Sequence, residues 1–130
     1  LNLDQRILAL PPKKKKESYP KDHDISYMWE NLKAMMLVIY NSNLPNKEKL
    51  VNLFALGTDF DGYIDPLDDY PTNLEFDDMK AALIKKIKDD KDVNGLLFGL
   101  SPGEFADRFC YTNAYEFVLK HIEKKEELLA

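Results

Sequence analysis

Two aspartates, separated by one residue, follow a short apolar run near the middle of the chain. The run VNLFAL (residues 51–56) is followed by a Gly-Thr pair, and Asp59 and Asp61 then flank a phenylalanine, with Gly62 directly after them. An apolar run of this length that ends at glycine predicts a buried strand. Carboxylates placed directly after a strand lie at its carboxyl end, where open sheets and α/β barrels put their chemistry. The aspartate pair is therefore the leading candidate for a functional site.

The composition predicts one globular domain without a nucleic-acid surface. The chain has 130 residues, of which 45% are hydrophobic and 32% charged, and its net charge is −5. This length allows one modest domain with its own core, and the acidic balance argues against general nucleic-acid binding. No apolar run approaches the roughly 20 residues that span a bilayer. The chain starts without methionine, so we expect a processed product or a piece of a larger protein, and the sequence indicates no compartment.

The predicted elements of the first half alternate between strands and helices. Residues 1–4 alternate in polarity like the end of a strand, and residues 11–25 hold prolines and a run of four lysines, which is typical of a loop. Ser26 is expected to cap a long amphipathic helix that leads into the strand at residues 51–56. This order predicts an α/β fold with parallel strands and packing helices. Two strands do not form a stable sheet, so further strands must lie undetected, on another chain or in missing sequence.

Local capping signals predict the helices of the second half. Thr72 and Glu75 form a capping box. Ser101, followed by Pro102 and then by Glu104, is also typical of a helix start.

The last predicted helix is capped by residues 112–113 and carries one of the two histidines. Its residues predicted to face inward are Ala114, Phe117, Val118, His121 and Ile122. A histidine on such a face is ordinarily part of the core. His23 lies in the lysine-rich loop without a second histidine nearby, so neither histidine is assigned as a metal ligand.

Carboxylates at D-x-D-G spacing occur in calcium loops and in one class of phosphatases. An EF-hand calcium loop needs glycine at loop position 6 and glutamate at position 12; counted from Asp59, position 12 is Tyr70, which excludes this loop. A haloacid-dehalogenase-like phosphatase has a strand that ends in D-x-D-G-T. In such an enzyme Asp59 would be the nucleophile and Asp61 the general acid, with magnesium between them and the phosphate. Tyr63 stands where that family has threonine, and the phosphatase stays an alternative.

Three segments resemble the membrane (renal) dipeptidase family of metallo-dependent hydrolases. ALGTDFDGYIDP (residues 55–66) resembles the G-[ST]-D-F-D-G signature of that family. LNLDQRIL (residues 1–8) resembles the preceding strand of bacterial relatives, and FCYTNAYEFVL (residues 109–119) resembles the terminal helix. Asn113 matches an asparagine of the family, whereas Tyr111 and Thr112 stand where the family has two glycines.

The resemblance implies that residues 1–130 are the C-terminal fragment of a (β/α)8 barrel hydrolase. The fragment would contribute the last two strands and several packing helices, with residues 11–25 as an inserted loop. Such enzymes hydrolyse a dipeptide or a related amide with two zinc ions that activate a bridging water. The resemblance gives Asp59 the proton-handling role beside that water. Asp61 is expected to shape the turn and Gly62 to let the backbone bend, and Arg6 either holds a substrate carboxylate or pairs with Asp4.

The zinc ligands that the resemblance implies are not in this chain. They are a His-x-Asp pair near the start of the family's barrel, a glutamate in its middle and two later histidines. We therefore expect the 130 residues alone to be inactive, to need the remainder of the barrel as a partner, and to self-associate through exposed strand edges. A free-standing helical interaction domain, in which D-F-D-G is only a turn, is the alternative from another functional class.

Overall fold

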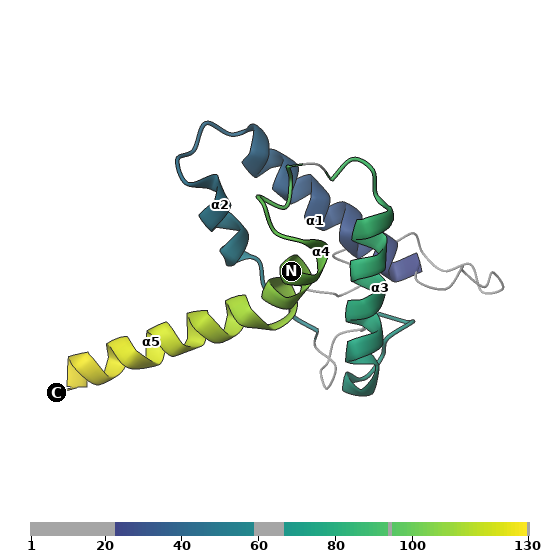
Figure 1. The fold of residues 1–130 in the computed structure, drawn as a ribbon. Helices are drawn as coiled ribbons and strands as arrows, with labels where there is room; N and C mark the ends of the chain where they lie inside the picture. Colours follow the sequence, from purple (N-terminus) through teal and green to yellow (C-terminus); the bar gives the residue numbers. More distant parts are fainter. Residues whose placement is uncertain (1–22, 59–66, 94, 130) are drawn as a thin grey trace.

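The computed structural model describes residues 23–58, 67–93 and 95–129, and this part of the chain is helical, with no strand (Figure 1). The elements in chain order are α1 (His23–Asn41), α2 (Lys47–Leu50), the 3-10 turns η1 (Val51–Leu53) and η2 (Asn73–Glu75), α3 (Phe76–Asp89), α4 (Pro102–Asp107), the π-helical turn η3 (Arg108–Thr112) and α5 (Asn113–Leu129). The predicted α/β fold, an incomplete (β/α)8 barrel, is therefore wrong. The strand predicted at residues 1–4 lies outside the described residues.

The apolar run at residues 51–56 is not a strand, because its backbone N–H groups form hydrogen bonds within a 3-10 turn and to the turn η3. It continues α2 as the turn η1, in which the Phe54 N–H donates to the Val51 carbonyl at 3.2 Å. Val51 is buried, whereas Asn52 and Leu53 are exposed, so the run lacks the two covered faces of a buried strand. Further on, the Leu56 N–H donates to the carbonyl of Phe109, in η3, at 3.0 Å.

The core lies where α1, α3 and the α4–η3 segment meet. The fully buried residues of α1 are Ile25, Met28, Trp29, Leu32 and Met36, and those of α3 are Met79, Leu83 and Ile87. From the third element, Phe105 packs edge-on against Trp29, with 6.3 Å between ring centroids, and stacks on Phe109. The 3.6-residue period of these apolar side chains explains why each element forms a helix with one covered face.

The capping signals of the second half are confirmed. The Thr72 side chain accepts a hydrogen bond from the Leu74 N–H at 3.2 Å, and the Glu75 carboxylate accepts one from the Thr72 N–H at 3.0 Å. At the start of α4 the Ser101 side chain accepts from the Glu104 N–H at 3.2 Å, and the Glu104 carboxylate accepts from the Ser101 N–H at 2.8 Å. Each box satisfies backbone donors that the first helical turn leaves without intrahelical partners.

Two predicted boundaries at the start of α1 are wrong. The helix begins at His23, so Ser26 lies inside it and does not cap it. For the same reason the last three residues of the predicted loop, 23–25, belong to α1, while residues 11–22 lie outside the described part.

Helix α5 leaves the body of the protein, and Figure 1 shows its C-terminal end far from the other helices. Phe117, Val118 and Ile122 were predicted to face inward, yet they are 63%, 52% and 52% exposed. His121 is also exposed, and its Nδ1 lies 2.8 Å from the carbonyl of Phe117 in the same helix. The apolar period of α5 is therefore real, but no described element covers it.

Candidate functional site

Asn113 forms hydrogen bonds to the backbone stretch that precedes the segment containing Asp59 and Asp61. The Asn113 side chain is 5% exposed, and its Nδ2 donates to the carbonyls of Val51 at 3.2 Å and Phe54 at 2.8 Å. One carboxamide nitrogen thus binds both ends of the turn η1, across about sixty residues of sequence. The last residues before the Gly-Thr pair are fixed to the start of α5.

The π-helical turn η3 provides a second contact to the same stretch. In an α-helix the Asn113 N–H would bond to the carbonyl of Phe109, four residues earlier. Here it bonds to the carbonyl of Arg108, five residues earlier, and the Phe109 carbonyl is left to accept from the Leu56 N–H. Single π-turns of this kind are frequent at functional sites. Only Gly57 and Thr58 separate Leu56 from Asp59.

Asp24 holds the chain on the other side of the segment. Its carboxylate is buried, and Oδ2 accepts hydrogen bonds from the backbone N–H groups of Asp68 at 2.8 Å and Asp69 at 3.4 Å. Leu67 and Tyr70, which flank these two residues in the sequence, are buried. Asp24 is the second residue of α1, where the helix dipole favours a negative charge. Buried polar side chains therefore attach the chain to the helices both before residue 57 and after residue 66.

The residues predicted for the site itself lie outside the described residues: Arg6, Asp59, Asp61 and Gly62. The structure consequently does not test whether they come together. The sequence did not indicate that Asp24 and Asn113 form hydrogen bonds to the backbone on either side of this segment. Asn113 was noted only as a match to the dipeptidase family and as a helix cap, and no local spacing links either residue to its backbone partners.

The described residues do not fit a zinc site. They include no group of three histidine, cysteine, aspartate or glutamate side chains that could hold a metal ion. His23 contacts Tyr27 and Asp24 at the start of α1, whereas His121 lies on the exposed helix α5. Burial raises the pKa of the Cys110 thiol to about 11, so it is not a thiolate at neutral pH.

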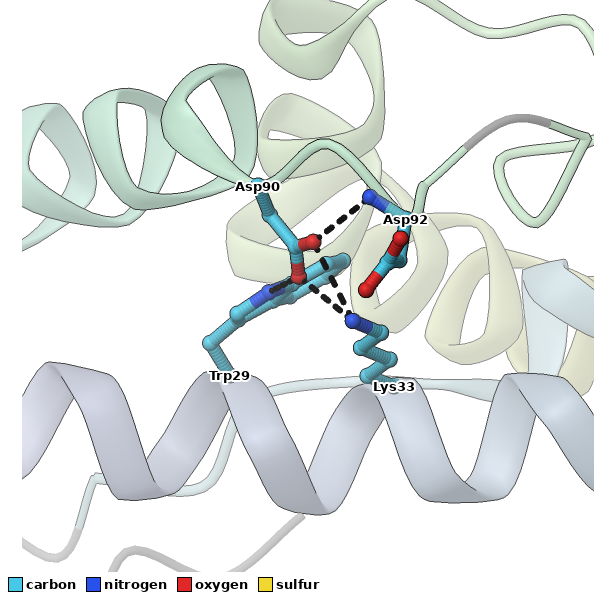
Figure 2. Close-up of polar contacts among 4 residues, drawn as sticks. All are labelled: Trp29, Lys33, Asp90 and Asp92. Atoms are coloured by element: carbon cyan, nitrogen blue, oxygen red, sulfur yellow. Dashed lines mark hydrogen bonds and ion pairs between the residues drawn. The ribbon is translucent and has the colours of Figure 1, made fainter.

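A second polar cluster, centred on Asp90, joins the end of α3 to α1 (Figure 2). The Asp90 carboxylate accepts from the Trp29 indole N–H at 2.7 Å, from the Lys33 ammonium at 2.8 and 3.1 Å, and from the Asp92 backbone N–H at 2.9 Å. Burial alone would raise the pKa of this carboxyl, but the hydrogen bonds from Lys33 and Trp29 lower it to about 2. The sequence predicted only a turn at residues 89–92.

The Asp90 cluster stabilises the fold and is not suited to act as a general base. It borders a hollow of about 390 Å³ that is lined by Glu30, Lys33, Lys86, Asp89, Asp90 and Asp92. A carboxylate with a pKa near 2 is a weak base at neutral pH, because general bases work best when their pKa is close to the operating pH. The Trp29 indole N–H and the Lys33 ammonium, both on α1, bind the Asp90 carboxylate, so the cluster fixes the end of α3 on α1.

Comparisons with protein-family models, curated proteins and solved structures found no match to this chain. Within the described residues, no helix has the length and apolar character needed to cross a membrane.

Proposed function

We propose that this chain is the C-terminal part of a zinc-dependent, dipeptidase-like hydrolase and that Asp59 is its proton-transferring carboxylate. The observation that carries the proposal is the attachment of both flanks of residues 57–66 to the helical body. Asn113 and the Phe109 carbonyl hold the chain before this segment, and Asp24 holds the chain after it. Buried polar side chains are costly to place, so two of them at the ends of one short segment suggest that its path matters.

The proposed reaction is hydrolysis of a dipeptide or a related amide. Asp59 takes a proton from the water that attacks the amide carbonyl and then gives it to the leaving amine, so that the carboxylate is regenerated. The two zinc ions that the resemblance implies would be bound by residues outside this chain. Asp61, Gly62 and Arg6 keep their proposed parts in shaping the turn and contacting substrate. A barrel is not part of the proposal; the role rests on the D-F-D-G segment and on the helices that hold its flanks.

The exposed apolar face of α5 favours a large partner that covers it. We propose that this partner is the remainder of the enzyme. Tyr115, Phe117, Val118, Leu119 and Ile122 are all at least 39% exposed. At helical spacing these side chains cover more than half of the circumference, whereas a helix on a protein surface commonly has a narrower apolar face. In the isolated chain this face would promote self-association.

The behaviour of the isolated 130-residue chain tests the proposal. It is expected to give no turnover with a panel of dipeptides in the presence of zinc, because Asp59 without bound metal lacks an activated water. It is also expected to elute as an oligomer in size-exclusion chromatography with light scattering. Val118→Glu should shift it toward monomer, and the matched control Leu74→Glu, at a position 92% exposed on η2, should not.

Three results would contradict the proposal. Robust, Asp59-dependent dipeptide hydrolysis by the isolated chain would show that it needs no further part. A monomeric chain with a cooperative unfolding transition would instead favour the free-standing helical domain. Magnesium-dependent hydrolysis of a phosphate ester would support the phosphatase alternative.

A further inference from the structure

We infer that two copies of this chain pair in antiparallel orientation through one stripe of exposed apolar side chains along α5. The stripe consists of Tyr111, Tyr115, Val118 and Ile122, which are between 49% and 63% exposed. The proposed function expects the isolated chain to associate, but it fixes neither the surface nor the form of the assembly. The pairing does not depend on hydrolase activity, because it follows from the described residues of α5 and of the turn before it.

The spacing of the stripe is that of a helix that packs along another helix. Tyr115, Val118 and Ile122 are three and then four positions apart, so they lie within about 60° of one another around α5. Tyr111 lies in the turn η3, and its ring stacks on that of Tyr115 with 5.4 Å between the centroids, so it extends the same stripe. A narrow apolar stripe with this spacing is typical of the seam of a coiled coil. The partner that it fits best is therefore a second helix.

The other sides of α5 do not continue the stripe. Phe117 is exposed too, but it lies roughly opposite Tyr115 on the helix, and its ring contacts that of His121. The exposed charged residues Glu116 and Lys120 also lie outside the stripe. Two identical stripes can therefore meet without bringing like charges together, which would oppose association. The side that carries Phe117 stays open for the remainder of the enzyme.

A second copy supplies the contact area that a dimer needs. The stripe and the neighbouring Leu119 present about 500 Å² per copy, since large apolar side chains have about 150–250 Å² each and these are roughly half exposed. Two copies would together bury about 1,000 Å², which is near the lower limit for a specific interface. Figure 1 shows that α5 extends away from the other helices, so a second α5 can lie along it.

The order of side-chain sizes along the stripe favours the antiparallel direction. Its two tyrosines precede the smaller Val118 and Ile122. In an antiparallel pair Tyr111 meets the partner's Ile122. Tyr115 likewise meets the partner's Val118, so every contact joins a large and a small side chain, and the distance between the helix axes stays even. A parallel pair would set tyrosine against tyrosine and would bring both bodies to the same end.

The test compares Ile122→Glu with the matched control Phe117→Glu, which adds the same charge to another exposed side of the same helix. Sedimentation equilibrium of the wild-type 130-residue chain should fit a monomer–dimer equilibrium. Ile122→Glu should raise the dissociation constant of the dimer by about tenfold or more, because it places two glutamates in the seam. Phe117→Glu should change it by less than about twofold. Circular dichroism should be the same for all three chains, since both positions are exposed.

Disulfide cross-linking tests the direction of pairing. The background is Cys110→Ala, because Cys110 is the only cysteine of the chain. In a mixture of Tyr111→Cys and Ile122→Cys chains, cross-links should form mainly between the two variants, whose substituted positions meet in the antiparallel pair. Cross-links that form mainly within each variant would show a parallel pair and overturn the antiparallel arrangement.

Two further results would overturn the pairing itself. One is an unchanged dissociation constant for Ile122→Glu, which would mean that the chain associates through another surface. The other is a wild-type chain that stays monomeric at every concentration. The two proposals fail separately, because a complete enzyme that hydrolyses dipeptides as a monomer would reject the pairing and support the hydrolase.

Discussion

Replacement of Asp59 by asparagine in the complete enzyme is expected to lower kcat for dipeptide hydrolysis by about 10² to 10⁴, the usual contribution of a general acid–base residue. Asparagine has a similar shape but cannot accept a proton from water or return it to the leaving amine. Because substrate contacts are preserved, KM should change little. Asp59 lies outside the described residues, so this prediction rests on the D-F-D-G resemblance and on the two held flanks. The measurement is steady-state kinetics with a dipeptide substrate.

The matched control for this variant is Asp78→Asn, which changes an exposed carboxylate on α3. It alters the net charge by the same amount and should leave both kinetic constants near their wild-type values. Equal activity of the Asp59 variant and the wild type would remove Asp59 from the mechanism. A loss of the same size in both variants would point to a general charge effect.

Asp90→Ala is expected to lower the free energy of unfolding by about 3 kcal/mol, because it leaves the buried Trp29 indole N–H and the half-buried Lys33 ammonium without an acceptor. The Trp29 indole N–H would lose its partner in the core, and the end of α3 would lose its attachment to α1. The measurement is urea denaturation followed by circular dichroism, which does not depend on the Trp29 fluorescence that the substitution itself alters. The neighbouring Asp89→Ala removes only an exposed ion pair with Lys85 and should cost less than about 0.5 kcal/mol.

The Asp90 variant also has a pH signature. The pKa of Asp90 is about 2 in the folded protein against an ordinary value of 3.8, so its stabilising contribution is complete above about pH 4 and is lost as the pH falls toward 2. This shift corresponds to about 2 kcal/mol. The difference in stability between wild type and Asp90→Ala should therefore shrink across that window. A difference that stays constant from neutral pH to pH 2 would mean that the ionised carboxylate is not what stabilises the contact.

Features that depend on near neighbours in the sequence were predicted well. The Thr72–Glu75 and Ser101–Glu104 boxes involve residues three positions apart, and both form as expected. The apolar stripe of α1 was also predicted, since its core residues follow the helical period. Such signals need no knowledge of the rest of the fold.

Features that depend on distant contacts were not predicted. The run at residues 51–56 was expected to be a strand, and short apolar runs are ambiguous in this respect. Its conformation is instead set by Asn113 and Phe109, more than fifty residues away. The pairing of Lys33 with Asp90 spans a similar separation. For α5, periodicity identified an apolar face correctly but could not say what covers it.

The most direct test of the claim that this chain is part of a hydrolase is the reading frame upstream of Leu1 in the source DNA. We predict further codons in the same frame, with a His-x-Asp pair near their start and two later histidines, because the zinc ligands that the resemblance implies are not in this chain. A start codon immediately before Leu1 would contradict the claim. The protein would then be a free-standing helical domain, the alternative in which the D-F-D-G segment is only a turn.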